Sequence, residues 1–111
     1  MNTRNQVTLI GRLGKDPELT STPNGGQVTR FTIATDDSYT DRDGNRVERT
    51  DWHNVECWGG LAEVIARYCR KGKEIALSGK LKTDSWEKDG EKKYKTYVLM
   101  EDFAFIGKKE D

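Results

Sequence analysis

The sequence has few of the residues that catalytic and metal sites need. Its 111 residues include one histidine and two cysteines. There is no Ser/His/Asp set, no His/Cys cluster and no glycine motif of the kind that cradles phosphate. The only histidine, His53, falls on an inward strand position, where a hydrogen-bonded core or interface residue is the commoner role. Cys57 and Cys69 are expected to be buried, reduced thiols. We therefore expect no enzyme, no metal and no cofactor.

Long apolar segments and net charge are also missing. No apolar run approaches the roughly 18 residues of a membrane helix, and the N-terminus has no apolar signal region, so we expect a cytosolic protein of one domain. Hydrophobic residues make up 33% and charged residues 34% of the chain. This composition is lean for a self-sufficient monomer and favours association of copies. A formal net charge of zero argues against a generic nucleic-acid binder, which is usually basic.

The charges are nevertheless unevenly distributed along the chain. Residues 36–56 carry three arginines against seven acids, whereas residues 67–95 carry ten lysines and arginines against five acids. Because a surface field depends on where the charges lie, a basic stripe can bind phosphates on a neutral protein. A solvated charged face is an equally good interpretation for any single lysine.

Aromatic residues are present at polar strand positions. The strand period of two places Trp52 and Trp58 on one face of residues 51–58 and Val55 on the other, so the apolar face lacks the tryptophans. Trp86 likewise shares its parity with lysines. Exposed rings beside cations can hold unpaired bases, because stacking is worth about 1–3 kcal/mol per base. Any single ring could instead lie in a core or a subunit interface, and Tyr39, among aspartates, could be a loop anchor.

The order of predicted elements is strand, strand, strand, helix, strand, strand. Strands are expected at residues 5–13, 28–35, 50–58, 75–86 and 94–106. The helix is expected at 61–68, and its apolar face should carry Leu61, Val64, Ile65 and Tyr68. This order is that of the OB-fold, a five-stranded, partly open Greek-key barrel that binds oligonucleotides or oligosaccharides. The predicted fold class is all-β with one helix between strands 3 and 4, in a single domain whose core spans residues 5–107.

Several ordered segments carry a resemblance to a known family. They are residues 5–18, 23–26, 50–53, 61–72 and 79–81, followed by Trp86. In these segments the chain resembles the bacterial single-stranded DNA-binding protein family. The resemblance implies sequence-tolerant binding that coats and protects exposed strands in DNA replication, recombination and repair. It also implies a homotetramer, or at least a dimer, in the bacterial cytoplasm at the nucleoid.

The resemblance and the strand parity together nominate site residues. In the family four aromatics stack on bases, and the matching positions here are Tyr39, Trp52, Trp58 and Trp86. Candidate phosphate contacts, chosen from outward positions near the rings, are Arg12, Arg30, Lys73, Lys80 and Lys82. His53 and the first strand are the candidates for an oligomer interface.

Two departures from the family pattern and two alternative functions stay open. Gly60 stands where relatives often have a lysine, which would remove a phosphate contact. The chain stops at Lys108-Lys109-Glu110-Asp111, without the flexible linker and acidic tip that recruit replication and repair enzymes, so it is a core fragment or a tailless relative. One alternative is an OB-fold replication-restart accessory or interaction protein with weak nucleic-acid binding. The other is an oligosaccharide-binding module, against which the basic neighbours of the rings argue.

Overall fold

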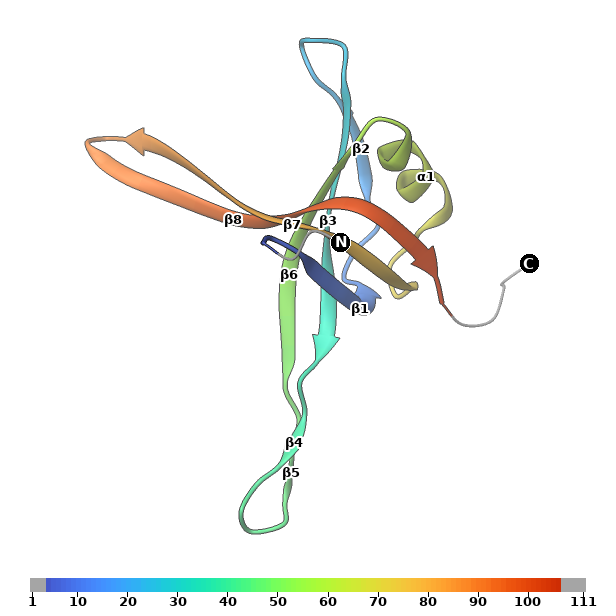
Figure 1. Ribbon diagram of the computed structural model, residues 1–111, viewed down its shortest axis with the longest axis vertical. Coiled ribbons are helices and arrows are strands. Elements are labelled where there is room, and N and C mark those ends of the chain that lie inside the picture. The colour runs from blue at the N-terminus through green and yellow to red at the C-terminus, as the bar shows by residue number, and fades with distance from the viewer. Residues whose placement is uncertain (1–3, 107–111) are drawn as a thin grey trace.

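The computed structural model describes residues 4–106, so the predicted chain end at Lys108–Asp111 lies outside the described residues. The ribbon is shown in Figure 1. Its elements are β1 (Val7–Leu13), β2 (Glu18–Ser21), β3 (Gln27–Asp36), β4 (Tyr39–Thr40), β5 (Arg46–Val47), β6 (Thr50–Trp58), α1 (Gly60–Tyr68), β7 (Glu74–Lys88) and β8 (Glu91–Phe105). No helix in this part of the chain is long and apolar enough to cross a membrane.

All five predicted strands and the predicted helix are present, together with three short strands that were not predicted. The four residues of β2 are all exposed, so they show no apolar alternation. Strand β2 forms because it pairs with β3 from Glu18↔Arg30 to Ser21↔Gln27. Strands β4 and β5 are two residues each and form a separate hairpin. Periodicity cannot detect elements this short.

The sheet closes into a partly open ring. Strand β1 pairs with β7 from Val7↔Gly79 to Arg12↔Glu74, and it meets β3 at Arg12↔Ala34 and Leu13↔Ile33. Strand β7 then pairs with β8, β8 runs parallel to β6 for two residue pairs, and β6 pairs with β3. The predicted fold class is confirmed, although the six-stranded sheet with β2 at its edge is not a regular closed barrel.

The core fills the inside of this ring. It contains Phe31 and Ile33 from β3, Val55 and Cys57 from β6, and the helix residue Ile65, each at most 2% exposed. Because Val55 and Cys57 are buried and alternate with less buried residues along the strand, the predicted parity of β6 is confirmed. Cys57 and Cys69 are both buried and free, as predicted.

The prediction that Tyr68 lies on the apolar face of the helix is wrong. Tyr68 is 60% exposed, whereas Ala62, Ile65 and Cys69 are fully buried. At 100° per residue these three positions form one narrow stripe toward the core, and Tyr68 lies about a quarter turn away from it. A long side chain at that angle reaches solvent.

The β7–β8 and β4–β5 hairpins project from the ring, as Figure 1 shows. The outer half of the β7–β8 hairpin, which we call the arm, runs from Leu81 to Val98 and is exposed over most of both strands. The β4–β5 hairpin extends β3 and β6 in another direction. The radius of gyration is therefore 16.3 Å. A compact domain of this size would have a value of about 13 Å.

Candidate nucleic-acid interface

All four predicted rings are exposed. Trp52 is 60% exposed, Trp58 43%, Trp86 46% and Tyr39 51%. Exposure at this level excludes a core role for each ring within one chain. It is the condition that stacking on an incoming base requires.

Trp52 and Trp58 mark the two ends of one face of β3 and β6. Across the strands, Trp52 lies opposite Ala34 and Trp58 lies opposite Val28. Between the two tryptophans, Asn54 lies opposite Thr32 and Glu56 lies opposite Arg30. These four residues are all polar. Six residues of extended strand separate the rings by about 20 Å. Room for further nucleotides therefore remains between the two rings.

Each of these tryptophans lies close to a glycine. A Cβ atom on Gly14 would lie 2.4 Å from Cζ3 of Trp52, so the Trp52 ring packs directly against the backbone there. A Cβ atom on Gly26 would lie 3.7 Å from Cζ3 of Trp58, an ordinary contact distance. The position of the Trp52 ring therefore depends on the absence of a side chain at Gly14.

A second support holds Trp58. Its indole Nε1 donates a hydrogen bond to Oε2 of Glu56 at 3.0 Å. The other carboxylate oxygen, Oε1, accepts a bond from Nε of Arg30 at 2.9 Å. The Glu56 side chain is only 12% exposed, against 54% for Arg30. Arg30, a predicted phosphate contact, thus has its charge compensated by a carboxylate.

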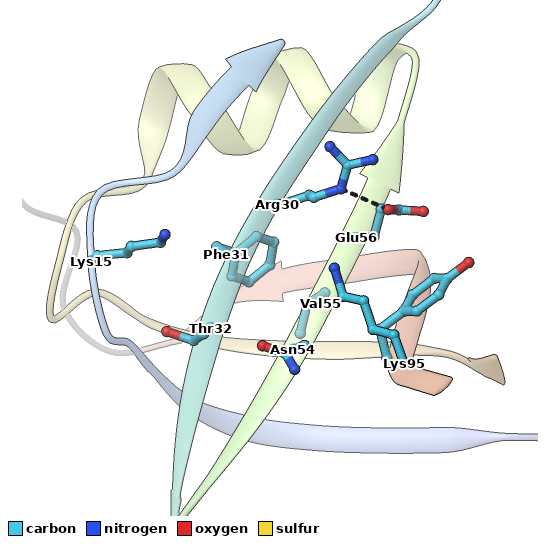
Figure 2. Close-up of a pocket in the computed structure, with 9 residues that line it drawn as sticks. Lys15, Arg30, Phe31, Thr32, Asn54, Val55, Glu56 and Lys95 are labelled. Carbon is cyan, nitrogen blue, oxygen red and sulfur yellow. Dashed lines mark hydrogen bonds and ion pairs between the residues drawn. The ribbon is translucent and has the colours of Figure 1, made fainter. Parts of the chain in front are cut away.

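A shallow pocket opens between the two tryptophans, and Figure 2 shows its lining. The floor comes from β3 and β6, and the sides come from elements that are distant in sequence. Lys15 and Lys95 approach the two strands from opposite sides in Figure 2. The residues that line the pocket are Lys15, Arg30, Phe31, Thr32, Asn54, Val55, Glu56, Lys95 and Tyr97.

Sequence reasoning missed Lys15, Lys95 and Tyr97. The side formed by β8 exists because β6 and β8 run parallel at Val55↔Val98 and Glu56↔Leu99, a pairing without a local signal. Partial burial, and secondarily the charges of Glu56 and Asp84, raise the pKa of Tyr97 above its ordinary value. Tyr97 therefore keeps its proton at neutral pH and can donate a hydrogen bond.

The arm continues the face that begins at the pocket. Tyr97 lies opposite Lys82, Lys95 lies opposite Asp84, and Trp86 lies opposite Lys93. Directly opposed residues in an antiparallel pair share a face, and alternate residues along a strand do so too. Trp86 and Lys82 therefore share the arm face that carries Lys95 and Tyr97 into the pocket.

The remaining predicted cations differ in their surroundings. Arg12 lies opposite Ala34, which in turn lies opposite Trp52, and its Nη1 donates to the Gly72 carbonyl at 3.0 Å. Lys80 pairs with Glu101 at 3.8 Å, and Nζ of Lys73 lies 5.4 Å from the centre of the Phe105 ring. Neither of these two lysines lines the pocket.

Tyr39 and His53 also stand apart from the pocket. Tyr39 lies on the β4–β5 hairpin, opposite Val47. His53 is half-buried, and its Nε2 lies 2.9 Å from Oγ1 of Thr35 on the neighbouring strand. The histidine thus has a polar partner within its own chain. Its role in an oligomer interface stays a prediction.

Comparisons with known proteins agree on one family. Residues 4–106 match the profile of the Single-strand binding protein family. Single-stranded DNA-binding protein 1 of Chlorobaculum tepidum is 43% identical over 108 residues, which cover 96% of this chain and 67% of that protein. The protein of the same name from Xylella fastidiosa is 37% identical over 113 residues, covering all of this chain and 83% of that one.

Two solved structures resemble the fold closely. A Plasmodium falciparum SSB in complex with ssDNA superposes with a TM-score of 0.84 at 28% identity, covering 96% of this chain and 98% of that one. A deletion mutant of the single-stranded DNA binding protein from Thermus aquaticus gives 0.82 at 36% identity. That match covers 93% of this chain, which spans half the length of the Thermus chain.

Proposed function

The chain belongs to the single-strand binding protein family, and on this basis we propose that it coats exposed single-stranded DNA with little sequence preference. The role that we propose is protection of single strands during replication, recombination and repair, in the bacterial cytoplasm at the nucleoid. The observation that carries the proposal is the pocket face between Trp52 and Trp58, which continues along the arm to Trp86. The proposed activity is binding and includes no chemical step.

The face from Trp52 through the pocket and along the arm to Trp86 is the proposed DNA path. Along it, stacking binds the bases and charge binds the phosphates. Bases stack on Trp52, Trp58 and Trp86, and Tyr39 adds a fourth ring beyond the end of β6. Stacking tolerates any sequence, because every base has a π-face. Duplex DNA binds poorly, because its bases are stacked on one another and cannot reach the rings.

Cations at the edges of the path supply the phosphate contacts. We assign the main contacts to Lys15, Lys95 and Lys82, and to Arg12, which Ala34 of β3 separates from Trp52 in the same cross-strand row. Arg30, Lys73 and Lys80 contribute less in this proposal, because a carboxylate or a ring already engages each of them.

Titration of tryptophan emission tests the proposed function. Single-stranded oligo-dT should quench the emission, and raising the salt concentration should weaken binding, because neutralised phosphates release counterions. A duplex of equal length is the control and should quench little. Unchanged emission with oligo-dT at low salt would contradict the proposal.

We also propose that copies of the chain associate into a homotetramer, or at least a dimer. Strand β1 is paired with β7 from Val7 to Arg12 but meets β3 only at Arg12 and Leu13, so among residues 4–106 most of its second edge has no strand partner. Ile10, on the outer face of β1, is 57% exposed. Open edges and exposed apolar residues favour pairing with another chain.

A further inference from the structure

A carboxylate in the middle of a path for a polyanion is unexpected. Glu56 lies on β6 between Trp52 and Trp58, and it lines the pocket. A phosphate placed there would be repelled. The group expected to face Glu56 in a complex is therefore a base, with the phosphates near the cations at the edges, Lys15 and Lys95.

The Glu56 carboxylate is held in place by two hydrogen bonds but can accept more. Arg30 donates to Oε1 at 2.9 Å and Trp58 donates to Oε2 at 3.0 Å. An ionised carboxylate offers about four lone-pair positions, so about two remain after these bonds. Together these two bonds hold the side chain in one orientation. The result is an oriented hydrogen-bond acceptor that lines the pocket.

We propose that Glu56 is a specificity-determining residue that favours bases carrying an exocyclic amine over thymine. The inference rests on the proposed function and refines it. The N4 amine of cytosine is a donor that a glutamate accepts, whereas O4 of thymine is an acceptor. Thymine would place two acceptors against each other in a partly enclosed site. The amide of Asn54 and the hydroxyl of Thr32, which also line the pocket, can meet the rest of the base edge.

The two ligands that test this inference differ at the base edge alone. Oligonucleotides of one length are made from thymidine or from 5-methyl-deoxycytidine, which share the methyl group and differ at ring position 4 and in the proton on N3. The native protein should bind the 5-methylcytosine oligomer about tenfold more tightly, the size expected of one hydrogen bond to a charged acceptor. In Glu56→Gln the ratio should fall to near one, since a carboxamide can donate to O4 of thymine.

Glu101→Gln is the matched control, because Glu101 forms an ion pair with Lys80, as Glu56 does with Arg30, but does not line the pocket. It should keep the native ratio. An equal ratio in the native protein and Glu56→Gln would overturn the inference, as would an equal shift in Glu101→Gln.

A measurement on the native protein tests the inference even if the Glu56→Gln variant folds poorly. An oligomer of N4,N4-dimethyl-deoxycytidine retains the cytosine ring but has no amine proton to donate. It should lose the tenfold advantage, and its retention would overturn the inference. If no single-stranded oligomer binds, the proposed function fails; if all bind with equal affinity, only the role of Glu56 fails.

Discussion

The two tryptophans of the pocket face are held by different means. Trp52 rests on the backbone at Gly14, whereas Trp58 is tied by a hydrogen bond to Glu56. The position of Trp52 depends on van der Waals contact, and that of Trp58 depends on a hydrogen bond to a carboxylate. Substitutions away from the rings should therefore affect the two stacking positions separately.

Gly14→Ala should displace the Trp52 ring without removing it. The new Cβ atom would lie 2.4 Å from Cζ3 of Trp52, and the ring is the part most able to move. We expect a loss of oligo-dT affinity approaching that of Trp52→Ala, for which stacking predicts about 1–3 kcal/mol. The double variant should lose little more than either single variant, because both act on one ring. Additive losses would show that Gly14 acts by another route.

Cys57 gives the stability of the fold a dependence on alkaline pH. Burial, followed by the nearby Cys69 and Glu56, raises the pKa of Cys57 from 9.0 to about 12. A raised folded-state pKa means that the stabilisation is complete below about pH 9 and is lost as the pH rises toward 12. Urea unfolding across this window should show a free energy that falls with pH, and less steeply in Cys57→Ala. Parallel curves for the two proteins would contradict this assignment.

At the scale of elements, long periodic segments could be predicted from the sequence and contacts between distant segments could not. The alternation around Trp52 and Trp58 identifies the outward face of β6, because Val55 and Cys57 are buried on the other face. The same logic fails for β2, whose residues are all exposed. The sides of the pocket depend on the parallel β6–β8 register and on a loop, which are set only when the ring closes.

The arm offers a direct comparison of its two faces. Trp86 lies opposite Lys93 on the face that continues from the pocket, whereas Tyr94 lies opposite Ser85 on the other face. Tyr94 is 63% exposed and Trp86 is 46% exposed. Solvent exposure alone would therefore favour Tyr94 as the stacking ring. Trp86→Ala should weaken oligo-dT binding by about 1–3 kcal/mol. Tyr94→Ala should change it little, and an equal loss would mean that the strand does not follow one face.

At the scale of the whole molecule, the open edge of β1 and the exposed Ile10 predict association. Light scattering on the native protein should give a mass of two or four chains at micromolar concentration. Ile10→Lys should shift the mass toward that of a monomer, because it places a charge on the outer face of β1. Thr20→Lys, on the exposed strand β2, is a control that should leave the mass unchanged. A native monomer would rule out the proposed assembly.

The arm and the β4–β5 hairpin have a consequence for how the chain responds to denaturant. Both project from the ring, and most of their residues are already exposed in the folded state. The urea m-value and the heat-capacity change of unfolding both scale with the surface newly exposed. The m-value and the heat-capacity change should therefore both be smaller than those of a compact protein of 111 residues, since most of the newly exposed surface comes from the ring. Values at the full expected size would indicate that neighbouring copies cover the hairpins, because dissociation then exposes that surface as well.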